Sequence, residues 1–349
     1  MMILAALLFL QNLSVFAQEA PSGLSVEHFF VDTHVLKNGK VINEIIINGP
    51  PEPPLGFARE VVTLPKSKSE AGIVTLSVPA YNWSFGCSAT SAAMIAAYHD
   101  RNGYPDMYTG PTNGGVMPMA NDVWPDWVDS YGSTRHQCPL SATHEGLDGR
   151  TTKGHVDDYW WGYGDNNSDP FFGNWTEHSY GDCTGDFMRT NQYNYDNSDG
   201  STKFWYYPNG APTHCSDLLL FNINNDGGCG IRDFYESRGY TVVETYSQYA
   251  DSMGRQYGFT YEQYKAEIDA GRPVMIHVEG HTMVGVGYDD SSSNLMYINN
   301  TWDYATHTME WGGSYAGMDL VGVTVVRLAP VQRKAVPLPA IWMLLGEVR

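Results

Sequence analysis

The chain has 349 residues, of which 42% are hydrophobic and 13% aromatic, enough to bury a sizeable core. It carries 20 Lys and Arg against 39 Asp and Glu, a formal net charge of −19. Because nucleic acids and anionic lipid surfaces both demand a basic face, this charge argues against either as a partner.

Residues 1–17 predict a secretory signal peptide. An apolar run occupies positions 2–10, and Val-Phe-Ala at 15–17 fits a small-residue cleavage site. The basic residues that usually precede such a run are missing, since the first Lys or Arg is Lys37. The run is well short of the ~20 residues needed to cross a bilayer. We therefore expect an exported protein without a stable membrane span.

Residues 18–75 are predicted to form an extension before the catalytic domain. Apolar residues alternate along it, and Pro-Pro-Glu-Pro-Pro at 50–54 is typical of an extended connector. A pro-segment and a packed N-terminal arm both fit this pattern, and the sequence does not separate them.

The domain predicted over residues 76–330 begins with a cysteine at a loop-to-helix junction. Residues 86–90 read Gly-Cys-Ser-Ala-Thr, and apolar residues at three- and four-residue steps predict a helix from Cys87 to about Arg101. The positive end of a helix dipole lowers the pKa of a cysteine there and favours the thiolate. Cys87 is therefore the candidate nucleophile, and a buried core cysteine is the alternative.

Residues 104–229 predict a long, loop-dominated insertion, because they are rich in Gly, Asp, Asn, Tyr and Trp and poor in aliphatic runs. Its aromatic density favours an ordered segment over a disordered one. An Asp-rich stretch at 196–200 lacks the distal Glu of a calcium-binding loop and is interpreted as a solvated turn.

Five cysteines in an exported chain predict paired disulfides and one free thiol. With Cys87 reserved for catalysis, sequence order favours the pairs Cys138–Cys183 and Cys215–Cys229. A zinc site built from these four is the alternative, but no Cys-x-x-Cys pair supports it.

Strands dominate the remainder of the domain. A short helix is expected over 230–238, and a capping box at Thr260 and Gln263 opens another that runs to Ala270. Strands are expected at 273–278, 282–288, 295–299 and 321–328. The predicted fold class is therefore α+β.

Two residues of this β region complete a catalytic set. His281 begins a strand preceded by glycine, where its ring can hold the Cys87 thiolate, and the Asn300 side chain can accept the second ring N–H. His277 and Asp303 are the alternatives. Strand alternation places Asn300 and Asp303 on opposite faces, and we favour Asn300.

These motifs resemble those of the bacteriocin-processing-like (peptidase C39-like) group of papain-like cysteine peptidases. Residues 86–90 resemble the Gly-Cys-x-Pro-Thr nucleophile helix of that group. Gly-His-x-x-Val-x-Val-Gly-Tyr at 280–288 and Tyr-Ile-Asn-Asn-Thr-Trp-Asp at 297–303 are similar to its His and Asp strands. Asn300 stands where the group usually has Asp, and Asn-Thr-Trp is similar to the Asn-Ser-Trp of papain-like enzymes proper. The resemblance covers roughly residues 76–103 and 230–330.

The resemblance implies a papain-like two-lobe fold, with a helical lobe that carries Cys87 and an antiparallel β lobe that carries His281 and Asn300. Residues 104–229 would be a disulfide-stapled insertion. The implied activity is that of a thiol-dependent peptidase or amidase acting on a peptide or protein, with no cofactor or metal. An inactive papain-like fold that serves as a surface or matrix binding module is one alternative, and a transglutaminase-like acyl transferase is another.

The oxyanion hole departs from the family pattern. Papain-like enzymes place a Gln six residues before the nucleophile, and this chain has Tyr81 there. Asn82 offers an amide N–H one residue nearer, and Tyr81 offers a hydroxyl. Loss of one such donor costs ~100–1000-fold in rate, so both residues are candidate donors beside the main-chain N–H of Cys87.

Residues 331–349 are predicted to be a C-terminal tail. Val-Pro-Leu-Pro-Ala at 336–340, an apolar stretch and the final Arg349 resemble the PEP-CTERM sorting signal of exported Gram-negative bacterial proteins. The stretch is too short to span a bilayer and contains Glu347, so a degenerate signal and a frayed tail both fit. With the predicted signal peptide, this pattern favours a secreted or cell-envelope bacterial protein.

Overall fold

The computed structural model describes residues 29–58, 60–62, 72–108, 116–129, 132–144, 159–165, 183–190, 192–291 and 294–331. The predicted signal peptide and all but the first residue of the predicted tail lie outside these ranges. No helix within them is long and apolar enough to cross a membrane.

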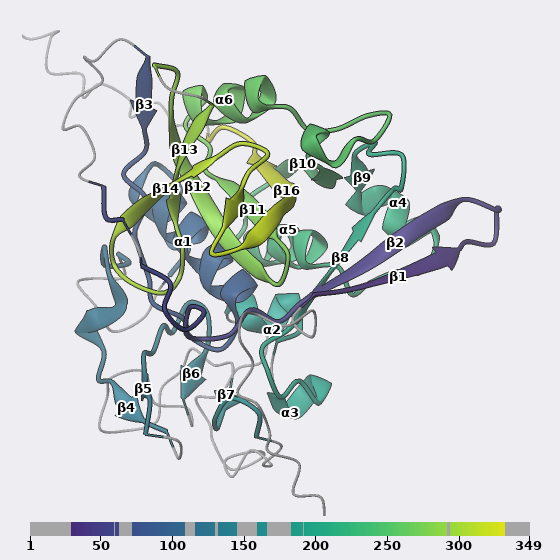
Figure 1. Ribbon diagram of the computed structural model, residues 1–349. Helices are drawn as coiled ribbons and strands as arrows, with labels where there is room; N and C mark the ends of the chain where they lie inside the picture. Colours follow the sequence, from purple (N-terminus) through teal and green to yellow (C-terminus); the bar gives the residue numbers. More distant parts are fainter. Residues whose placement is uncertain are drawn as a thin grey trace, which may run out of the picture.

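A nine-stranded sheet forms the centre of the molecule (Figure 1). Its main order is β14-β13-β12-β11-β16-β10-β9, with β3 added beside β12 and β15 beside β16, and every neighbouring pair is antiparallel. Together with the helices, this sheet confirms the predicted α+β class. The strands are β3 (Ile73–Thr75), β9 (Thr213–His214), β10 (Val242–Tyr249), β11 (Val274–Val278), β12 (His281–Asp289), β13 (Leu295–Asn299), β14 (Thr306–Glu310), β15 (Ser314–Tyr315) and β16 (Met318–Leu328).

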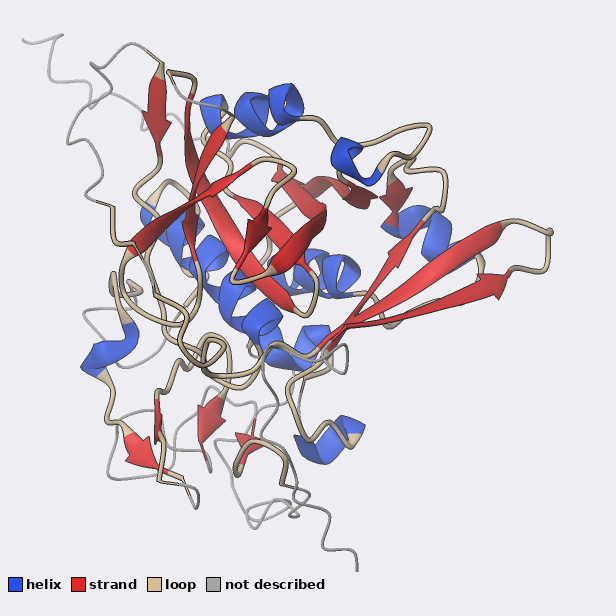
Figure 2. Ribbon diagram, in the orientation of Figure 1, coloured by secondary structure: helices blue, strands red, loops and turns tan. Residues whose placement is uncertain are grey.

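Both faces of this sheet are buried. Successive side chains of a strand point to opposite sides, so neighbouring residues of one strand pack in different cores. On β11, Met275 packs in the core that includes α1 (Cys87–Arg101) and α5 (Gly227–Ser237). Its neighbours Val274 and Ile276 pack in a second core with α6 (Tyr261–Asp269). Figure 2 shows these helices around the sheet. The predicted capping box at the start of α6 is present.

Helix α1 packs directly against β12, and two serines join them. Ser88 Oγ lies 2.8 Å from Thr282 Oγ1, and Ser91 Oγ donates to Thr282 O at 3.2 Å. The small residues of α1 permit this close approach, since several of them are fully buried: Ala89, Ala92, Ala93 and Ala96. The first turn of α1 is therefore fixed beside the start of β12.

The N-terminal segment is built into the fold through a second sheet. Strands β1 (Phe29–Val35) and β2 (Val41–Ile47) form a hairpin, and β2 also pairs with β8 (Thr202–Tyr206). The hairpin extends from the body in Figure 1. Its inner strand is anchored, because Ile45 and Ile47 are fully buried in the α1 core. The chain that leaves β2 consequently runs across the body of the molecule.

The described parts of residues 104–229 are mostly loop. Besides β8, β9 and the start of α5, their elements are η3 (Asn121–Val123), β4 (Trp127–Val128), β5 (Thr134–Arg135), β6 (Thr143–His144), β7 (Tyr159–Trp160), α2 (Thr184–Met188), α3 (Gln192–Tyr195) and α4 (Cys215–Leu220); η4 (Asp251–Met253) comes after β10. Aromatic packing holds this region to the nucleophile loop. The Trp160 ring lies 5.7 Å from that of Trp83 and is stacked 5.3 Å from that of Phe85.

One of the two predicted disulfides is present. Cys215–Cys229 joins α4 to α5, whereas Cys138 is a buried free thiol, so the Cys138–Cys183 prediction is wrong. That prediction was based on the order of the cysteines in the sequence. Their order does not show whether two cysteines lie close enough, with suitable Cβ directions, to form a disulfide. Burial raises the pKa of Cys138 to about 12, which holds it as a neutral thiol. Within the described residues, no group of His, Cys, Asp and Glu is placed to hold a metal.

Replacing both Cys215 and Cys229 by Ser is expected to lower the free energy of unfolding by about 3 kcal/mol. The bond closes a loop between residues 14 apart in the sequence, and opening it enlarges the unfolded ensemble. Urea denaturation of the double variant and the parent measures this. A difference below about 1 kcal/mol would show that the bond is not a main support of this region.

Candidate active site

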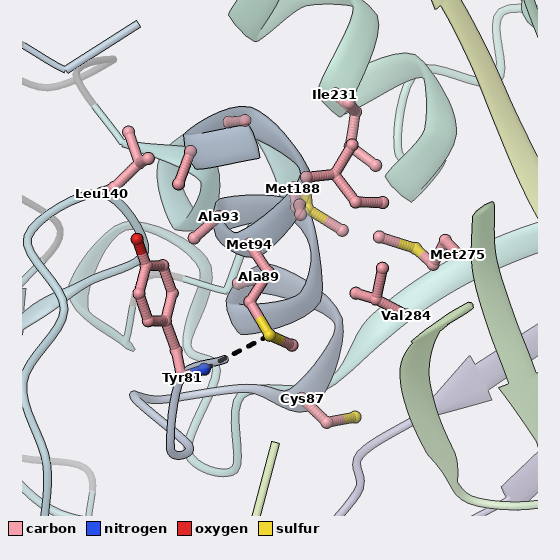
Figure 3. Packing of buried hydrophobic residues seen from close by; sticks show 14 of the residues in the cluster. Tyr81, Cys87, Ala89, Ala93, Met94, Leu140, Met188, Ile231, Met275 and Val284 are labelled. Atoms are coloured by element: carbon pink, nitrogen blue, oxygen red, sulfur yellow. Dashed lines mark hydrogen bonds between the residues drawn. The ribbon is translucent and has the colours of Figure 1, made fainter. Parts of the chain in front are cut away.

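Cys87 is the first residue of α1, and a glycine turn places it there (Figure 3). Phe85 and Gly86 both have positive φ, 46° and 117°. A Cβ on Gly86 would lie 2.7 Å from the carbonyl oxygen of Gly200, so the turn requires glycine. The thiol of the next residue is fully buried.

His281 is the first residue of β12, and its ring is anchored through one nitrogen. Nε2 donates to the main-chain oxygen of Asn300 at 2.7 Å, and Thr301 Oγ1 lies 3.2 Å from the same nitrogen. Since a carbonyl only accepts, the proton sits on Nε2 and the lone pair on Nδ1. Nδ1 is buried and has no hydrogen-bond partner among the described residues.

The Cys87 thiol and the free ring nitrogen of His281 both lie close to Gly49. A Cβ on Gly49 would lie 2.7 Å from Cys87 Sγ and closer still to His281 Nδ1. Both atoms are therefore neighbours of the same α-carbon. The structure brings together these two predicted residues, which lie far apart in the sequence, and adds Gly49 from the N-terminal segment.

Asn300 contacts His281 through its main chain rather than its side chain. Strand β13 ends one residue earlier, and Thr301 has a φ of 65°, so the strand alternation assumed for residues 300–303 does not hold. The Asn300 side chain donates to the Tyr315 hydroxyl at 2.9 Å and accepts the Trp302 N–H at 2.9 Å. It thus fixes the turn that carries the carbonyl.

The two alternative residues have other partners. His277 lies on β11 with its ring nitrogens 3.1 Å from Thr282 Oγ1 and 2.9 Å from Thr324 Oγ1. Asp303 lies 2.9 Å from His307 Nε2. His277 is therefore a satisfied core histidine.

One of the two predicted oxyanion donors has another partner. The Tyr81 hydroxyl donates to the Pro118 oxygen at 2.8 Å, and in Figure 3 its ring runs away from the Cys87 side chain. The Asn82 side-chain oxygen is buried without a hydrogen-bond partner among the described residues. Asn82 does line a small cleft beside Trp83.

Two tryptophans at the site were not singled out from the sequence. Trp83 Nε1 donates to the Gly49 oxygen at 3.2 Å, and Trp302 Nε1 donates to the Pro50 oxygen at 3.0 Å. The Trp302 ring also stacks on His281, with centroids 4.1 Å apart. Asn-Thr-Trp at 300–302 was a sequence signal for Trp302, whereas no motif marks the indole of Trp83.

Burial decides the protonation states of the pair. It raises the pKa of Cys87, although N–H groups of Thr282 and Gly49 and nearby hydroxyls act in the opposite direction. Burial also lowers the pKa of His281 to about 4, with the Asn300 carbonyl opposing that shift. The expected helix-dipole lowering of the thiol pKa is therefore outweighed, and thiol and ring are both neutral near pH 7.

Comparison with known families reaches only part of this site. Residues 220–316 match the family model described as the Peptidase_C39 like family, a segment that contains His281 and Asn300 but not Cys87. No curated protein and no solved structure matches the chain. The region that carries the candidate histidine is thus similar to C39-like cysteine peptidases.

Proposed function

We propose that this protein is an exported thiol-dependent peptidase or amidase that acts through Cys87 and His281. One observation carries the proposal: the thiol and the unpartnered, buried Nδ1 of His281 lie at the same α-carbon, with Nε2 held by Asn300. The family match over residues 220–316 supports it. The papain-like division into two lobes and the PEP-CTERM-like sorting of residues 331–349 belong to the same proposal.

The proposed reaction is acyl transfer in two steps. His281 Nδ1 takes the thiol proton while Cys87 Sγ attacks the carbonyl carbon of the substrate. Nδ1 then gives that proton to the leaving amine, the C–N bond breaks, and a thioester remains. Water loses a proton to Nδ1 and attacks the thioester carbon, the C–S bond breaks and the acid is released. Nδ1 then returns the proton to the sulfur, which restores the thiol.

The developing oxyanion needs donors aimed at it. The main-chain N–H of Cys87 and the Trp83 indole N–H are the proposed pair, because Trp83 Nε1 already binds a carbonyl oxygen beside the thiol. The adjoining Asn82 is the alternative side-chain donor. Asn300 acts by positioning the His281 ring.

The two alternative functions differ from the peptidase in the fate of the acyl group. A transglutaminase-like enzyme would pass it from the thiol to an amine instead of water. A binding module would perform no acyl transfer at all.

Peptide or amide turnover is expected to fall in proportion to the fraction of Cys87 that iodoacetamide has modified. Mass spectrometry maps the modified residue, and turnover is measured on the same samples. The segment around Gly49 is displaced from the thiol for this experiment, because it lies against Cys87. The buried Cys138 serves as internal control and should stay unmodified. Full turnover after complete modification of Cys87, or no turnover of any acyl substrate, would refute the proposal.

A further inference from the structure

Residues 48–52, which we call the N-terminal arm, run across the proposed catalytic pair. Gly49 is buried, and there is no room for a side chain between it and the site. A Cβ would collide with Cys87 Sγ, with His281 Nδ1 and with the Gly280 oxygen, 2.8 Å away. The arm therefore fills the space in which a substrate carbonyl would be attacked.

Two indole N–H groups hold the arm through consecutive carbonyls. Trp83 binds the oxygen of Gly49, and Trp302 binds that of Pro50, at 3.2 Å and 3.0 Å. These donors read the peptide backbone, so they recognise an extended segment rather than one side chain. At the thiol itself, the contacts require glycine.

The ends of the arm are fixed as well. Asn48 Nδ2 donates to Asp199 Oδ2 at 2.8 Å, next to the end of β2. At the other end, Glu52 pairs with the buried Arg135 at 3.1 Å. Because β2 is anchored in the core, the arm is delivered to the site at high effective concentration.

The bound arm occupies the site through its backbone. The α-carbon of Gly49 lies beside the Cys87 thiol, and the Gly49 oxygen accepts from Trp83, the proposed oxyanion donor. While these contacts are kept, neither the thiol nor the donor is available to a substrate carbonyl.

We propose that Trp83 and Trp302 form a peptide-binding clamp over the catalytic pair, and that the N-terminal arm is its resident ligand, which keeps the enzyme latent until displaced. The latency part of this proposal rests on the proposed function, because only an enzyme can be latent. Occupancy of the clamp by the arm can be tested without measuring turnover. Displacement of the arm would admit water, remove the burial that keeps thiol and imidazole neutral, and free the clamp for an extended peptide with glycine at the thiol.

Gly49→Ala tests the clamp, because the added Cβ cannot fit beside the thiol. The rate of Cys87 modification by iodoacetamide near neutral pH is expected to rise about tenfold or more over the parent. Leu55→Ala is the matched control, since Leu55 lies just beyond the arm and is fully exposed; its rate should equal that of the parent. Equal rates in the parent and Gly49→Ala would overturn the proposal.

A second measurement covers the case in which Gly49→Ala folds poorly. A site-specific protease sequence placed in the exposed turn at residues 55–56 allows the chain to be cut after folding, with every clamp residue unchanged. The cut leaves the arm tethered through β2 alone, so the arm should dissociate more often and Cys87 modification should be faster. The free peptide Ile-Asn-Gly-Pro-Pro-Glu should slow it again. No change on cutting, or no protection by the peptide, would count against the clamp.

The outcomes separate the two proposals. If the cut protein gains thiol reactivity but hydrolyses no amide, the clamp stands and the peptidase proposal fails. If the parent already hydrolyses amides as fast as the cut protein, the peptidase proposal stands and latency fails.

Discussion

Replacing His281 by Ala is expected to lower the turnover of a small activated amide by about 10⁴-fold, measured on protein with the N-terminal arm displaced. The structure places the ring nitrogen Nδ1 and the Cys87 thiol beside the same α-carbon, and in the proposed reaction Nδ1 both removes and returns the reacting proton. The loss should appear in kcat, since the histidine does not hold the substrate. Thermal unfolding of the same variant checks that the fold is kept.

Asn300→Ala is the control for that experiment. The main-chain carbonyl that accepts from His281 Nε2 survives this change, and only the side-chain bonds to Tyr315 and Trp302 are lost. We expect a loss of no more than about tenfold in kcat, because the ring stays anchored. A loss as large as that of His281→Ala would return the orienting role to the Asn300 side chain.

The free energy of unfolding is expected to fall by several kcal/mol as the pH drops from about 6.5 to about 4. Burial lowers the pKa of His277 to about 3 and those of His99, His144 and His281 to about 4. Between these pH values the histidines of the unfolded chain bind protons, whereas those of the folded chain stay neutral. The free energy of unfolding is therefore highest above pH ~6.5 and falls as the pH approaches the pKa values of the folded state. Each unit of pKa difference is worth about 1.4 kcal/mol.

Two buried acids work against this trend. Burial raises the pKa of Asp226, the N-cap of α5, to about 6, so its folded form binds a proton that the unfolded chain releases. Burial also raises the pKa of Asp100. The contribution of these acids falls as the pH rises, but they are two groups against four histidines. Urea denaturation at steps of pH measures the sum, and His277→Gln should flatten the slope. A stability that is level from pH 6.5 to 4 would contradict the four lowered pKa values.

Local sequence features were enough to predict the elements that carry the candidate site. Spacing of apolar residues and a Gly before Cys87 predicted α1, and the structure begins and ends it at the expected residues. The capping box at Thr260 predicted the start of α6, and Gly280 marked the start of β12 at His281. These features depend on neighbours in the chain, because dihedral preferences, caps and strand periodicity are local properties.

Long-range contacts determine what surrounds those residues, and the sequence did not reveal them. Thr301 has a positive φ, so the chain turns there instead of continuing the strand. The main-chain carbonyl of Asn300, rather than its side chain, is the partner of His281. Gly49, from the N-terminal segment, reached the thiol because β2 pairs with β8. The pKa of Cys87 is raised and not lowered because the free energy of a charge depends on whatever covers it, and the covering groups come from residues far away in the chain.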